Sequence, residues 1–205
     1  MTQQLHGPGT AGQPDLRPAA LGVTAVLERI GDDRLGAPTP CPDYTVGHLI
    51  GHVAGLCAAF RDAARKDLGP TTDGDPGSAL PPEPPDQWRD RLPELLADMA
   101  EAWRSPLAWQ GRTRAGGVDL PGEAAGRFAL NELLVHGWDL ARATGQDYRP
   151  DPAGLEAVLA LLTPFTARSD GSGPFGRPVP VPPTAPLLDR VVALTGRDPG
   201  WRPSH

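Results

Sequence analysis

Glu132 and His136 are the residues whose types and spacing most clearly suggest chemistry. They lie four positions apart in the stretch Asn131–Leu140, which reads as the middle of a long helix. Residues four apart stack on one helix face, and a carboxylate and an imidazole stacked in this way can share a divalent metal ion. Apolar residues surround the pair on several sides, so we expect the helix to be buried and its carboxylate to need a partner such as a cation.

Histidines on a second predicted helix can complete such a site. Of the 5 histidines, His48 and His52 lie in the apolar stretch that follows Thr45. We predict that His52 joins Glu132 and His136, because two imidazoles and one carboxylate leave an open position for water or substrate, as catalytic zinc sites require. His48 lies one turn before His52 and would equally suit a ligand. We interpret His48 as a surface residue, or as one that contacts a ligand without binding the metal itself.

The same residues also have structural interpretations. Glu132 and His136 can form an ordinary contact within one helix, and His52 can be a histidine packed in the core. Asp139 can orient the imidazole of a metal ligand, or it can form an ion pair with Arg142.

Two further side chains near this stretch have alternative roles. Arg127, one turn before Asn131, can bind an anionic substrate group or lie in solvent. Trp138 is expected to pack rather than to stack on a ligand.

The composition limits the class of protein. The chain has 205 residues, 39% of them hydrophobic and 21% charged, which is typical of a globular domain. Its net charge of -6 argues against nucleic acid as the main partner, and no apolar run approaches a membrane span. Cys41 and Cys57 fit no zinc motif and are expected to be reduced, packed thiols, which places the protein in the cytoplasm.

Apolar periodicity predicts a chain built from helices. We expect a disordered tail over residues 1–14 and a single domain over 15–201. The predicted helices span about 16–30, 46–66, 86–103, 122–144, 152–166 and 185–194. Gly- and Pro-rich segments at 69–85 and 168–183 are predicted to be loops, and residues 105–121 a small hairpin or an irregular loop with extended pieces at 108–110 and 117–120. Four main helices joined by long loops indicate a bundle, in which metal ligands point inward from facing helices.

Three motifs carry a resemblance to a known family. They are the segment Pro38–Val46 followed by His52, the segment Asn131–Gly145, and the ending that contains Phe175-Gly176, Asp189-Arg190 and Leu194–Pro199. The chain resembles the mycothiol-dependent maleylpyruvate isomerase N-terminal domain family, of the DinB/YfiT-like superfamily. The resemblance implies an all-α, DinB-like up-down four-helix bundle, here with extra C-terminal helices and long Pro/Gly-rich loops. It also implies a divalent metal, usually zinc, bound by His52, Glu132 and His136.

The resemblance implies a function as well. We expect a mycothiol-dependent thiol transferase or isomerase, in which a metal-bound thiolate attacks a small electrophile and His48 or Asp139 helps to move a proton. Nickel or iron would also suit the ligands. One alternative is a metal-dependent tailoring or hydrolytic enzyme of secondary metabolism that uses no thiol, and another is a non-catalytic binding or regulatory bundle. The sequence leaves the substrate and the oligomeric state open.

Overall fold

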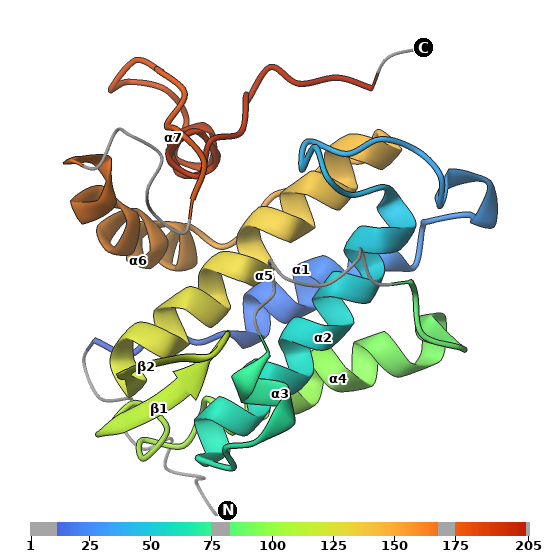
Figure 1. Ribbon diagram of the computed structural model, residues 1–205. Helices are drawn as coiled ribbons and strands as arrows, with labels where there is room; N and C mark the ends of the chain where they lie inside the picture. The colour runs from blue at the N-terminus through green and yellow to red at the C-terminus, as the bar shows by residue number, and fades with distance from the viewer. Residues whose placement is uncertain (1–11, 75–82, 168–174, 204–205) are drawn as a thin grey trace, which may run out of the picture.

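Four long helices form the body of the molecule. The computed structural model describes residues 12–74, 83–167 and 175–203. Helices α1 and α2 each pack against both α4 and α5 (Figure 1). These helices are α1 (Arg17–Leu27), α2 (Val46–Arg65), α4 (Trp88–Ala102) and α5 (Gly122–Thr144). The predicted four-helix bundle is therefore confirmed, with the bounds of α5 as expected and each end of α1 and α4 one to three residues shorter than expected.

Helix α5 is the central element. Its second half is buried on every side, from Leu133 to Ala141, as the apolar residues spread around this stretch predict. Two glycines let other aromatic residues approach its backbone. A Cβ at Gly126 would lie 2.5 Å from the Trp109 ring, and a Cβ at Gly137 would lie 2.4 Å from the Tyr148 hydroxyl. Gly145 ends the helix in the left-handed conformation, with φ of 71°.

The Pro-rich connector sets the start of α2. Residues Pro38 and Thr45 form an isolated β-bridge, so the connector closes on itself before the helix begins. The Thr45 hydroxyl then accepts a hydrogen bond from the His48 backbone N–H at 3.3 Å, and the His48 Nδ1 accepts one from the Thr45 N–H at 3.5 Å. The predicted N-cap at Thr45 is confirmed, and His48 supplies the other half of the cap.

Short elements lie at the end of the bundle where α5 begins. Strands β1 (Arg112–Ala115) and β2 (Val118–Pro121) form an antiparallel hairpin, in which Arg112 pairs with Pro121. The hairpin expectation is confirmed, but the first strand starts after the predicted piece at 108–110, where Ala108 and Trp109 are instead buried in a turn. The predicted loop at 69–85 is wrong at its start, because helix α3 (Pro70–Asp73) forms there. Residues 75–82 lie outside the described part.

The C-terminal segment packs on the outside of α5. Helix α6 (Pro152–Leu162) contacts α5, continues as the 3₁₀ helix η2 (Thr163–Ala167), and packs against α7 (Leu187–Leu194) (Figure 1). After α7 the chain returns to α5, where the Arg142 guanidinium donates to the Pro199 carbonyl at 3.0 Å. A second 3₁₀ turn, η1 (Asp32–Arg34), follows α1. Of the predicted disordered tail, residues 1–11 lie outside the described part.

The helices of the described segments are unsuited to a bilayer. Among residues 12–74, 83–167 and 175–203, no helix is both long enough and apolar enough to span a membrane.

Candidate metal centre

Two helices bring three metal-binding side chains together. His52 lies on α2, and Glu132 and His136 lie on α5. Each offers one donor atom, and these donors all lie within 4.8 Å of one another. Because α2 packs directly against α5, a spacing of four residues on one helix and a single histidine on the other suffice to form the cluster.

His136 lies between two carboxylates. Its Nε2 is 2.9 Å from Glu132 Oε2, and its Nδ1 is 3.1 Å from Asp139 Oδ2. Burial alone would lower the pKa of His136, but the two carboxylates outweigh burial and raise that pKa above its ordinary value. The Glu132 carboxylate is held at its other oxygen, which accepts from the Asn131 side-chain amide at 3.4 Å.

His52 is held by packing rather than by hydrogen bonds. Its ring lies between Tyr44, with centroids 5.1 Å apart, and His136, whose ring meets it edge-on at 4.9 Å. No hydrogen bond to its ring nitrogens occurs within the described ranges. Burial, helped by the charge of His136, lowers the pKa of His52 to about 4. His52 is therefore neutral near pH 7, and its lone pair is available to a cation.

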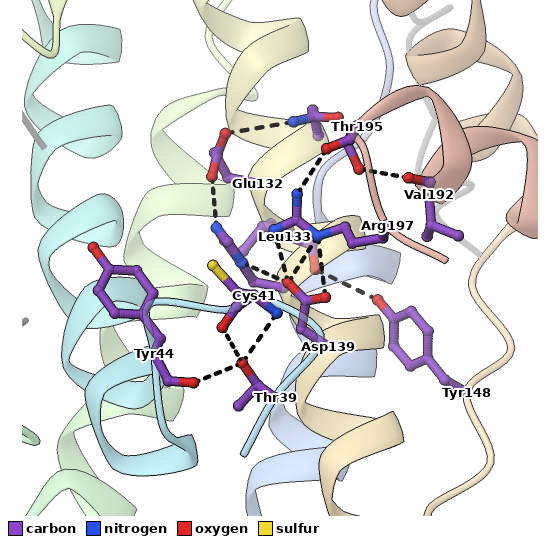
Figure 2. Close-up of polar contacts among 12 residues, drawn as sticks. Thr39, Cys41, Tyr44, Glu132, Leu133, Asp139, Tyr148, Val192, Thr195 and Arg197 are labelled. Carbon is purple, nitrogen blue, oxygen red and sulfur yellow. Dashed lines mark hydrogen bonds and ion pairs between the residues drawn. The ribbon is translucent and has the colours of Figure 1, made fainter. Parts of the chain in front are cut away.

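Asp139 is fully buried and pairs with an arginine from the C-terminal segment. Arg197 donates from Nε to Asp139 Oδ1 at 3.1 Å and from its terminal NH2 group to Oδ2 at 2.9 Å (Figure 2). Burial alone would raise the pKa of Asp139, but Arg197 and His136 hold it below its ordinary value. The predicted alternative of an Asp139–Arg142 ion pair is wrong, because Arg142 lies over the Trp138 ring and donates to Pro199.

The other predicted residues lie outside the ligand cluster. His48 lies in the first turn of α2, and its Nε2 is 3.5 Å from Oε1 of Glu83. Arg127 forms an ion pair with Glu123 at 3.1 Å, and Trp138 is buried as expected. Burial raises the pKa of Cys41 to about 11, so this thiol is protonated near neutral pH and poorly nucleophilic. Figure 2 places it beside the Asp139–Arg197 pair.

Sequence reasoning missed two residues around the cluster. Tyr44 packs against His52, and Arg197 neutralises Asp139. Both belong to the motifs that carry the family resemblance, and that was the only signal in the sequence for either of them.

The donor set fits a divalent metal. Two imidazole nitrogens and one carboxylate oxygen are a combination that zinc accepts, and three protein ligands leave further coordination positions open. The exposed fraction of the Glu132 side chain is 23%, so one side of the cluster faces solvent. The arrangement can bind a cation and present its open side to a small molecule.

Sequence comparisons find a matching family and two relatives of the chain. The sequence model of the mycothiol maleylpyruvate isomerase N-terminal domain matches residues 16–141. An uncharacterized protein of Mycobacterium tuberculosis strain H37Rv is 30% identical over 177 residues, which is 84% of this chain and 90% of that protein. A second uncharacterized protein of that strain is 28% identical over 214 residues, covering 93% of this chain and 76% of that protein.

A solved structure shares the fold. The crystal structure of the mycothiol-dependent maleylpyruvate isomerase superposes with a TM-score of 0.54 at 22% sequence identity, covering 78% of this chain and 72% of that one. A crystal structure of a histidine-to-alanine mutant of that enzyme gives a TM-score of 0.55 with the same coverage.

Proposed function

Because the chain belongs to the family of the mycothiol maleylpyruvate isomerase N-terminal domain, we propose that it is a mycothiol-dependent thiol transferase or isomerase acting on a small electrophile. His52, Glu132 and His136 would hold a divalent ion, with zinc as our first choice. The observation that carries the proposal is the convergence of their three donor atoms within 4.8 Å. A bound ion would lower the pKa of a coordinated thiol and so supply the nucleophile.

The charges around the cluster suit an anionic ligand. Both imidazole ligands would bind as neutral groups, Glu132 carries one negative charge, and Asp139 is neutralised by Arg197. A divalent ion in this setting keeps a net positive charge. A site of that charge favours a thiolate over a neutral thiol.

Asp139 and His48 would orient a ligand and move a proton, respectively. Asp139 has no exposed surface and lies 3.1 Å from His136 Nδ1, so it would orient the His136 ring. His48 is 28% exposed, so of the two candidates for proton transfer it is the one that can exchange protons with solvent. The mycothiol thiol must stay reduced to act as a nucleophile, which is consistent with the cytoplasm as the compartment of this protein.

A binding experiment with mycothiol tests the proposal. Reduced mycothiol is titrated into the zinc-loaded protein, and oxidised mycothiol disulfide, which has no free thiol, is the control. We expect saturable binding of the reduced form alone, with loss of binding in His52→Ala. Equal binding of both forms, or none, would refute the thiol-dependent function. Retained zinc with no thiol binding would favour the thiol-independent tailoring or hydrolytic enzyme.

A further inference from the structure

We propose that Arg197 is a positioning residue for this centre: it fixes the Asp139 carboxylate, which in turn holds the His136 ring so that Nε2 faces Glu132 and His52. The inference rests on the metal site proposed above. It adds a residue that lies 56 positions beyond the end of the family match, since that match stops at 141.

The contacts form a continuous chain from the C-terminal segment to the ligand. Arg197 reaches both oxygens of Asp139, at 3.1 Å and 2.9 Å, and Asp139 Oδ2 is 3.1 Å from His136 Nδ1. A carboxylate that accepts from Nδ1–H leaves Nε2 as the nitrogen that can bind a metal. The planar guanidinium fork restricts the rotation of the carboxylate, which a point charge would not do.

Asp139 needs this partner because of its surroundings. Its side chain is fully buried, and Glu132 places a second carboxylate on the far side of the same imidazole. A buried carboxylate without a cationic partner is costly. Lys66 and Arg142, two other cations of the bundle, donate to the carbonyls of Ala108 and Pro199 instead.

The backbone of the C-terminal segment presents Arg197 to the site. Gly196 has φ of 86°, and a Cβ there would lie 2.9 Å from Gly176 Cα, so the turn requires glycine. The Arg197 guanidinium also donates to the Thr195 carbonyl at 3.3 Å, which holds the side chain along its own backbone. The segment after α7 is thus part of the metal centre rather than an appendage to the bundle (Figure 2).

Arg142 offers a matched control. It lies on α5 three residues after Asp139 and also ties the C-terminal segment to the bundle, through the Pro199 carbonyl at 3.0 Å. Arg142→Met therefore loosens the same segment and removes the same charge, but it leaves the Asp139 contacts intact. Any effect that Arg197→Met shows beyond Arg142→Met belongs to the Asp139–His136 contact.

The experiment measures cobalt affinity and the His136 tautomer in the full-length protein. We expect Arg197→Met to weaken the Kd for Co²⁺ about 10- to 100-fold, while Arg142→Met leaves it near the wild-type value. Arg197→Lys, which keeps the charge but not the fork, should fall between them, and it serves as the test if Arg197→Met does not fold. In the zinc-loaded wild type, ¹⁵N NMR should show His136 with its proton on Nδ1, and the Arg197 variants should show a mixture of ring states.

The outcomes separate this inference from the proposed function. Wild-type affinity and an unchanged tautomer in both Arg197 variants would overturn the positioning role and leave the metal site intact. Equal losses in Arg197→Met and Arg142→Met would also overturn it, because they would show a general effect of loosening the segment. A wild-type protein that binds no metal would overturn the site itself.

Discussion

Acidification should weaken metal binding through a single proton. His136 Nε2 lies 2.9 Å from Glu132 Oε2, and Asp139 holds the other ring nitrogen. These carboxylates raise the pKa of His136 despite its burial. Its imidazole is therefore largely protonated in the metal-free protein below that raised pKa. A ring nitrogen must lose its proton before it can bind a metal, so metal and proton compete for Nε2.

The size of the effect follows from the other two ligands. Burial lowers the pKa of His52 to about 4, so His52 is mostly neutral at pH 5 and above. Glu132 has a pKa below its ordinary value, because its contact with His136 outweighs burial, and it is already ionised. One proton remains. The Kd should therefore rise about tenfold for each unit by which the pH falls below the His136 pKa, and it should be constant above that pKa.

Isothermal titration calorimetry can count this proton. Zinc is titrated into the metal-free, full-length protein at several pH values between about 5 and 8, in buffers with different ionisation enthalpies. Near the acidic end we expect about one proton released per ion. Asp139→Asn, which removes one of the two charges that raise the pKa, should shift the onset of the effect to lower pH. At the acidic end of this range, a proton count near zero or near two would refute the charge states inferred for His52 and His136.

Three further predictions follow from the fold and the site. Gly126→Ala should lower the free energy of unfolding by about 1–3 kcal/mol, because its Cβ would meet the Trp109 ring at 2.5 Å. Gly55→Ala, on an open face of α2 where a Cβ would have no atom within 4 Å, should raise the free energy of unfolding by about 0.5–1 kcal/mol. Urea titrations that give the same effect for both variants would contradict the packing described. Zinc at about 100 times its Kd should stabilise the protein by ~2.7 kcal/mol, and an unchanged thermal midpoint would argue against binding to the folded state. His48→Gln should leave the zinc Kd unchanged and lower the rate of the proposed mycothiol-dependent reaction. Loss of zinc binding in this variant would instead show that His48 is a ligand.

The sequence predicted the parts of the fold that depend on local signals. Helix α5 is predicted with its observed bounds because it is long, rich in apolar residues and followed by Gly145. The cap at Thr45 depends only on residues three positions apart. Helix α3 was missed because it is a single turn, in which the Gly69 N–H donates to the Thr72 hydroxyl at 2.9 Å. No periodicity marks so short an element.

The cluster of His52, Glu132 and His136 was predictable because helical spacing and helix packing determine it. Arg197 was not, because it lies 58 positions from Asp139 and follows a glycine turn with no regular pattern. Spacing favoured Arg142 as the partner of Asp139, but Arg142 projects toward Pro199 and Trp138 instead. A choice between two arginines depends on how the C-terminal segment folds back, and that information is not local.

Metal content tests the central claim most directly. The full-length protein, purified without a histidine tag, is loaded with zinc, freed of excess ion and measured by elemental analysis alongside His52→Ala and His136→Ala. We predict about one zinc per chain in the wild type and almost none in either variant, with the helical circular dichroism signal retained in all three. A wild-type stoichiometry near zero, or variants that keep their zinc, would contradict a cation held between α2 and α5.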